Sequence, residues 1–177
     1  DAGTIEFRDT CLVSLDDRRR TLLRRRHMGF VFQFFNLLPT LSVLDNVVLP
    51  QSLNGVGRPA ARRRARELLR AVGLAGREDS FADRLSGGEQ QRVALVRAVA
   101  HEPSVVFADE PTGNLDERTG EETLELLRSL VKSQGVALIM ATHSKDAAAQ
   151  CDDVYELRDG QLCDGSPAST GLSAGGA

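Results

Sequence analysis

Three short apolar runs, each ending abruptly at polar residues, constrain the fold of this chain more than any other feature. They are residues 28–32 (MGFVF), 104–108 (SVVFA) and 136–141 (VALIMA), and their length suits buried strands. The segments between them carry apolar residues at helical spacing, so strands alternate with helices along the chain. This alternation predicts an α/β layered domain whose sheet is largely parallel.

Polar residues follow each apolar run directly: Gln33 after the first, Asp109-Glu110 after the second and Thr142-His143 after the third. Parallel sheets bind ligands beyond the carboxyl ends of their strands, so we expect these groups at one edge. A strand that ends in Asp-Glu can place one carboxylate near Mg²⁺ and another near an attacking water. The plain alternative is an acidic surface pair, and a lone histidine or glutamine is weak evidence by itself.

Residues 85–92 (LSGGEQQR) open a further helix that is expected to run to about residue 101. Ser86 and Glu89 have the spacing of a capping box. Gly87 and Gly88 would let backbone N–H groups approach an anion closely, and the helix dipole adds partial positive charge there. The pattern therefore indicates a phosphate contact, although any helix cap of this sequence offers a simple structural alternative.

The remaining segments are assigned from their periodicity and their turn residues. The basic run at residues 18–27 (RRRTLLRRRH) is either a solvated helix face or a contact for lipid head groups or an acidic partner. The other expected elements are a strand at 3–8, helices within 40–74 with a break at 54–59, a helix at 117–133, and a hairpin at 154–163 turning at Asp159-Gly160.

Composition narrows the classes of function. The chain has 41% apolar and 27% charged residues, as ordinary globular domains do, and a net charge of −3 gives no general attraction to nucleic acid. No apolar run approaches the ~20 residues of a membrane span. If the protein acts at a membrane, we expect a partner to hold it there.

Taken in order, the Gln, LSGGEQQR, VVFADEP, GNLD and TH elements resemble the ATP-binding domains of ABC transporters, over about residues 3–163. LSGGEQQR is similar to the family signature, VVFADE to the Walker B strand and GNLD to the D-loop. Gln33 and His143 are similar to the Q-loop glutamine and the switch histidine. The resemblance implies a P-loop NTPase-type three-layer fold with a mostly parallel sheet and an inserted α-helical subdomain.

The same resemblance implies roles for four residues in ATP hydrolysis. Asp109 would organise Mg²⁺ through water, and Glu110 would be the general base that polarises the attacking water. His143 would contact the γ-phosphate. Gln33 would sense Mg²⁺ and the attacking water and relay their presence to a membrane subunit.

Other residues would act across a dimer. Ser86, Gly87 and Gly88 would contact ATP held by the other protomer, and Asp116 of the D-loop would reach across the same interface. The resemblance thus implies a head-to-tail homodimer that sandwiches two ATP molecules, closes on binding and reopens after hydrolysis.

Two longer stretches, RRRHMGFVFQFFNLLPTLSVLDNVVLP and ADEPTGNLD, resemble the lipoprotein-release and macrolide-export group, which includes the cell-division ATPase. Members of this group work with membrane permeases that have large extracytoplasmic domains. The resemblance therefore implies a peripheral protein on the cytoplasmic face of the inner membrane. The transported substrate is selected by the permease and is not encoded in an ATPase domain.

The chain departs from the family in one respect. The Walker A loop, G-x-x-x-x-G-K-[ST], is absent, and the only lysines, Lys132 and Lys145, do not follow its glycine pattern. By comparison with the family, we expect a preceding segment of about 40–50 residues that carries this loop, an aromatic adenine contact, a core strand and a helix. Without it, we expect residues 1–177 to bind ATP weakly, to hydrolyse none and to expose apolar surface.

The expected domain organisation is a partial ATPase domain at 1–163, with a helical subdomain at about 40–84, a core at 85–163 and a disordered tail at 164–177. An ATPase of DNA repair or chromosome maintenance is an alternative, because such proteins share the signature and Walker B patterns. Gln33 and Leu85 are 52 residues apart, and this insertion contains no heptads for coiled-coil arms. A non-catalytic regulator is disfavoured by the intact Glu110, His143 and signature.

Overall fold

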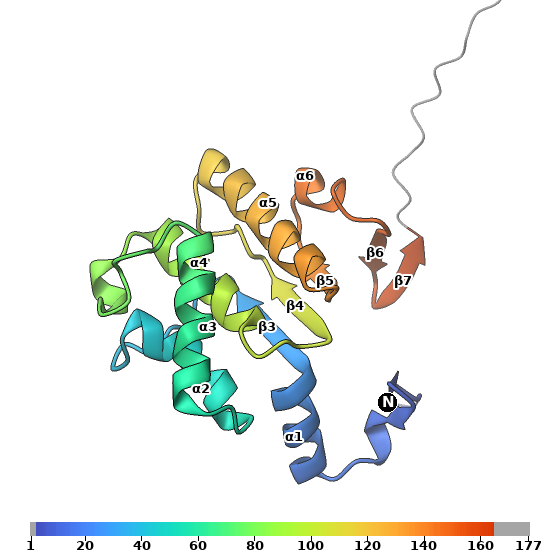
Figure 1. The fold of residues 1–177 in the computed structure, drawn as a ribbon. Coiled ribbons are helices and arrows are strands. Elements are labelled where there is room, and N and C mark those ends of the chain that lie inside the picture. Colours follow the sequence, from blue (N-terminus) through green and yellow to red (C-terminus); the bar gives the residue numbers. More distant parts are fainter. Residues whose placement is uncertain (1–2, 165–177) are drawn as a thin grey trace, which may run out of the picture. The chain divides into compact units, whose positions relative to one another are not determined.

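The computed structural model describes residues 3–164, which divide between residues 141 and 142 into two units. The first unit is built around a three-stranded parallel sheet, β3-β4-β5 (Figure 1). Its strands are β3 (Met28–Phe32), β4 (Val105–Asp109) and β5 (Ala137–Ala141), close to the three predicted apolar runs. The parallel α/β architecture expected from the alternating pattern is therefore confirmed.

Helices form the other layer of this unit. Three helices lie between β3 and β4 in the sequence: α2 (Val43–Leu53), α3 (Arg58–Ala71) and α4 (Gly87–Val99), with a 3₁₀ turn at Ala82–Arg84 before α4. The buried side chains of these helices and of the sheet form one core, whose largest members include Leu44, Leu69, Leu95 and Leu127. Leu127 comes from α5 (Glu117–Ser133), whose expected apolar stripe is buried as predicted.

Helix α4 packs directly on β3, and a glycine permits the close approach. A Cβ atom built on Gly29 would lie 2.2 Å from the carbonyl oxygen of Ala98 and 3.1 Å from its carbonyl carbon. Both are backbone atoms, which cannot rotate away as a flexible side chain can. The main chains of β3 and α4 are therefore in contact, and this contact fixes the helix against the sheet that carries Gln33.

The opposite face of the sheet carries partly exposed apolar side chains. Phe30 stacks on Phe32 at 6.0 Å and on Phe107 at 5.6 Å between ring centroids. Ile139, the partner of Phe107 in the strand register, is 56% exposed, and Phe32 is 38% exposed. The expectation of exposed apolar surface is confirmed at this face.

The N-terminal part of the unit differs in detail from the prediction. Instead of one strand at 3–8, a short hairpin joins β1 (Glu6–Phe7) to β2 (Thr10–Cys11), because Arg8 and Asp9 both adopt positive φ and turn the chain. A 3₁₀ turn (Leu12–Ser14) leads to the basic helix α1 (Asp17–His27), which has no buried residue. The arginines of α1 are therefore exposed, as both alternatives for this basic run require.

The second unit begins at Thr142. It contains α6 (Lys145–Ala148), a short helix that was not predicted, and the expected hairpin of β6 (Tyr155–Arg158) and β7 (Gln161–Asp164). Asp159 and Gly160 have φ values of 49° and 79°, the left-handed conformations that a tight hairpin turn requires. The expected tail lies outside the described residues, except for Asp164. Among the residues described, no helix has both the length and the apolar character for crossing a membrane.

Candidate functional site

The carboxyl ends of the three parallel strands lie at one edge of the sheet. The register aligns Phe32, Asp109 and Ala141, so Gln33 and Glu110 leave adjacent strands at the same level. The backbone N–H of Glu110 donates to the carbonyl of Ala141 over 2.9 Å, which extends the pairing one residue past the strand. The structure therefore brings Gln33, Asp109 and Glu110 together, as the strand pattern predicts.

The backbone at Glu110 is left-handed, with φ of 43°. This conformation costs a non-glycine residue about 1–2 kcal/mol, and such outliers occur preferentially at functional sites. The chain turns here, and the N–H of Gly113 donates to the carbonyl of Glu110 over 3.1 Å. The turn directs the chain away from the sheet immediately after the carboxylate pair.

Gln33 is held by the loop that follows this turn. The amide of Asn114 donates to the Gln33 carbonyl over 2.8 Å. A Cβ built on Gly113 would lie 2.9 Å from Gln33 Nε2, so the Gln33 side chain rests against this glycine. The loop between β4 and α5 thus fixes both the backbone and the side chain of Gln33.

The start of α4 reaches the same loop. Ser86 and Glu89 form the capping box that their spacing predicts. A Cβ on Gly87 would lie 3.8 Å from the Phe35 ring and 4.0 Å from Leu115, and one on Gly88 would lie 3.0 Å from Thr119 Cγ2. The signature glycines therefore pack against the GNLD segment and the first turn of α5 in their own chain.

The capping box lowers the pKa of Glu89, so the contribution of this residue to stability depends on pH. The Ser86 N–H, which donates to Glu89 Oε2 over 2.8 Å, lowers the pKa of the Glu89 carboxyl below its ordinary value of 4.5. Arg77, 3.2 Å from Oε1, adds to this shift. A lowered pKa means that the stabilisation is present above pH 4.5 and is lost as the pH falls through the lower, folded-state value.

We therefore expect Glu89→Gln to lower the free energy of unfolding of the complete protein by about 1 kcal/mol at pH 7, since it removes only the charged part of the cap. The difference between the two proteins should shrink as the pH falls below 4.5 and through the lowered folded-state pKa of Glu89, because a protonated glutamate is as neutral as glutamine. Chemical denaturation at a series of pH values measures this. A difference that stays constant throughout would contradict the prediction.

Asp116 is placed at the beginning of α5. Its carboxylate accepts from the Thr119 N–H over 3.1 Å and caps the helix. Hydrogen bonds from Thr119 lower the pKa of Asp116, so this exposed carboxylate is charged at neutral pH. The fold thus gives Asp116 a capping role, and a contact across a dimer interface stays a prediction.

His143 lies in the second unit, two residues after the end of β5. The Thr142 hydroxyl accepts from the Ser144 N–H over 3.1 Å, and the Ser144 hydroxyl accepts from the Ala147 N–H to cap α6. These bonds define the turn that carries the His143 side chain. The contribution of His143 to the site stays a prediction.

The side chains that support this site were not predicted from the sequence. Gln91, fully buried on α4, donates from Nε2 to the carbonyl of Pro111 over 2.5 Å, next to Glu110. Arg97, also on α4, donates to the carbonyls of Phe35 and Asn36. Sequence alone gives little signal for them, since a glutamine and an arginine on a helix usually face solvent.

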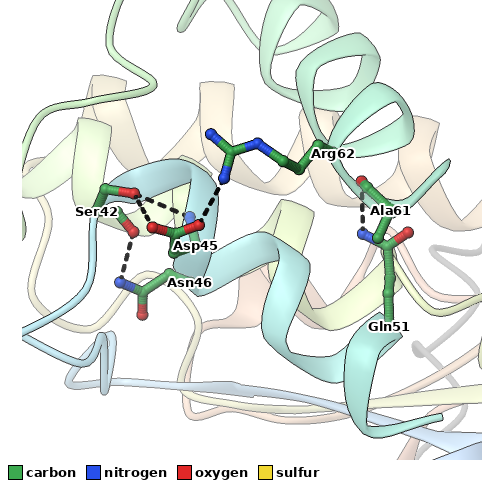
Figure 2. Close-up of polar contacts among 6 residues, drawn as sticks. All are labelled: Ser42, Asp45, Asn46, Gln51, Ala61 and Arg62. Carbon is green, nitrogen blue, oxygen red and sulfur yellow. Dashed lines mark hydrogen bonds and ion pairs between the residues drawn. The ribbon is translucent and has the colours of Figure 1, made fainter. Parts of the chain in front are cut away.

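A polar network in α2 and α3 holds the far end of the segment that follows Gln33 (Figure 2). The buried Asn46 accepts from the Leu38 N–H and donates to the carbonyls of Leu38, Leu41 and Ser42. Ser42 and Arg62 both hydrogen-bond to Asp45, and Gln51 donates to the Ala61 carbonyl. These bonds tie α2 to α3 and to residues 38–42.

The donor set at the sheet edge suits a hard cation. Asp109 offers an exposed carboxylate and Gln33 an amide oxygen, both ligands that Mg²⁺ accepts. No group of three or more acidic, histidine or cysteine side chains in residues 3–164 could enclose a metal.

Known proteins resemble this chain in sequence and in fold. The profile of the family described as ABC transporter matches residues 1–113. An uncharacterised ABC transporter ATP-binding protein of Mycobacterium tuberculosis (strain H37Rv) is 51% identical over 90% of this chain. The chain spans 64% of the length of that relative.

The lipoprotein-releasing system ATP-binding protein LolD of Novosphingobium aromaticivorans is 50% identical, over 91% of this chain and 72% of its own length. Among solved structures, the ATP-binding cassette MJ0796, a dimer in a post-hydrolysis state with ADP and Pi, superposes with a TM-score of 0.79. It is 36% identical and is covered over 71% of its length, against 91% of this chain. The named relatives are transporter proteins, and none of them supports the DNA-repair alternative.

Proposed function

Because the chain belongs to the ABC transporter family, we propose that the whole protein is the ATP-binding subunit of a transporter and hydrolyses ATP to drive a membrane permease. The observation that carries the proposal is the sheet edge at which Gln33, Asp109 and Glu110 meet. Relatives with similar sequences include LolD proteins, which are 47–50% identical to this chain.

In this proposal four side chains share the chemistry of hydrolysis. Bound Mg²⁺ would neutralise phosphate charge, and Asp109 and Gln33 would orient it, partly through water. Glu110 would accept the proton of the attacking water, since its carboxylate follows the strand at the same level. His143 would donate to the γ-phosphate and hold the active geometry.

We further propose that two copies act together, head to tail. Ser86, Gly87 and Gly88 would present the N-terminus of α4 to the phosphates of ATP on the partner, where N–H groups and the helix dipole favour negative charge. Asp116 would approach the same interface. Support comes from MJ0796, a family member solved as a dimer with ADP and Pi.

The proposed partner is a transmembrane permease with a large extracytoplasmic part, as in lipoprotein release or macrolide export. The protein would then sit peripherally on the cytoplasmic face of the inner membrane. The basis is the resemblance to LolD, a lipoprotein-releasing system protein. Recovery of the permease with the complete protein from detergent-solubilised membranes would support this, and separation of the two would contradict it.

The function is tested by comparing two polypeptides, residues 1–177 and a longer one to which an N-terminal segment with a G-x-x-x-x-G-K-[ST] loop is added. We expect Mg²⁺-dependent ATP turnover from the longer polypeptide only, because the backbone of the loop and its lysine make the main contacts with the phosphates. Phosphate release measures turnover, and nucleotide binding is measured separately. Lack of turnover by the longer polypeptide, or equal turnover by both, would contradict the proposal.

A further inference from the structure

Residues 34–41 connect β3 to α2 without forming a helix or strand. Side chains from other elements hold this segment at both ends. Asn114 binds the carbonyl of Gln33 at its start, and Asn46 binds Leu38 and the two carbonyls beyond it at its end. Between these two anchors the segment passes over α4, where a third contact holds it.

That third contact is the guanidinium of Arg97. Its Nη1 donates to the Asn36 carbonyl over 2.5 Å and its Nη2 to the Phe35 carbonyl over 2.8 Å. Two donors from one planar fork fix direction as well as distance, which a lysine ammonium does not. Burial lowers the pKa of Arg97, but a guanidinium remains protonated in proteins, so the contact persists at any physiological pH.

The held residues have a backbone that needs support. Asn36 has φ of 49°, a left-handed conformation that asparagine tolerates better than most residues. Its carbonyl is one of the two that Arg97 binds, so the arginine stabilises the turn three residues after Gln33. The same turn places the Phe35 ring against Gly87 at the start of α4.

Helix α4 therefore contacts the backbone next to Glu110 and the backbone next to Gln33. Gln91 binds the carbonyl of Pro111 beside Glu110, and Arg97 binds the segment beside Gln33. We infer that Arg97 is a positioning residue. By holding the backbone of Phe35 and Asn36 against α4, it keeps the Gln33 side chain in the position that hydrolysis requires. This inference rests on the proposed ATPase function and adds a residue to it.

A double-mutant cycle in the complete protein tests the inference. We expect Arg97→Leu to lower kcat about tenfold while KM for ATP and the amount of ATP bound per chain stay unchanged, because misplacing a reacting group slows chemistry without removing the phosphate grip. In a Gln33→Ala background, the same change should cost less than about twofold, since the side chain it positions is gone. Arg97→Lys should restore turnover only in part, because it keeps the charge and loses the fork.

Arg64→Leu is the matched control. Arg64 also donates to a backbone carbonyl, that of Ala100 at 2.9 Å, and pairs with Glu102 at 3.0 Å, but its bonds do not involve residues 33–36. Its effect on kcat should be small and equal in both backgrounds. An equal loss on Arg97→Leu in both backgrounds, or full rescue by lysine, would show a purely structural role and overturn the inference.

A readout without ATP separates this inference from the proposed function. With 3-fluorophenylalanine at position 35, the ¹⁹F resonance should broaden or shift in Arg97→Leu and stay unchanged in Arg64→Leu. A resonance that does not respond to Arg97→Leu would overturn the inference even in an active enzyme. Absence of turnover in the wild-type protein would instead contradict the proposed function, and full activity of Gln33→Ala would overturn the positioning role of Arg97.

Discussion

Glu110→Gln should lower kcat for ATP by about a thousandfold, because general-base catalysis typically contributes 10²–10⁴-fold. Glutamine keeps the size and hydrogen-bonding reach of the side chain and loses the ability to accept the proton. The left-handed turn at Glu110 and its bond to Ala141 are backbone features and should survive the change. ATP binding should therefore persist, and the proposed head-to-tail dimer should accumulate in its closed form, since in that proposal reopening requires hydrolysis. Phosphate release and size-exclusion chromatography with ATP measure the two effects.

Glu117→Gln is the control for this experiment. Glu117 lies exposed in the first turn of α5, seven residues further along, and its loss of charge should leave turnover within about twofold of wild type. If Glu110→Gln retained more than a tenth of wild-type turnover, another group would have to accept the proton. The role proposed for Glu110 would then be wrong.

Gly29→Ala should destabilise the complete protein by about 3 kcal/mol or more, at the upper end of the cost of overpacking a core. The new Cβ would meet the Ala98 carbonyl oxygen at 2.2 Å, and relief requires α4 to move away from β3. That movement would also disturb the bonds of Gln91 and Arg97, so turnover per folded molecule should fall. Urea denaturation measures the loss of stability.

Gly57→Ala provides the comparison. Gly57 has φ of −59°, and no atom lies within 4 Å of a Cβ built on it. Alanine there only weakens the cap of α3, at a cost of about 1 kcal/mol or less. Equal stabilities for Gly29→Ala and Gly57→Ala would mean that α4 adjusts freely, which the close packing of the backbones does not allow.

The strands and long helices could be predicted because their signals are local. An apolar run of strand length, a capping box at Ser86 and the leucine stripe of α5 each specify an element from nearby residues. The hairpin at Arg8 and Asp9 could not, since two non-glycine residues adopt positive φ there against their own preference. The short helix α6 was missed because four residues carry no periodic signal.

The polar edge of the sheet was also predictable, because parallel strands bring their carboxyl ends together by topology alone. The residues that support the edge were not. Arg97 lies 61 residues from Asn36, and Gln91 lies 20 residues from Pro111, so their partners are known only when the fold is known. Both look like solvent-facing positions on a helix until α4 is packed against the sheet.

The positive φ of Glu110 has a consequence for the stability of the protein. Folding alone would favour glycine or asparagine in this conformation, because they adopt it at less cost than glutamate. Under the role proposed for Glu110, its carboxylate lowers the stability of the fold, so glycine at this position should give a more stable protein that does not hydrolyse ATP. At position 110 the backbone conformation and the proposed chemistry therefore favour different residues.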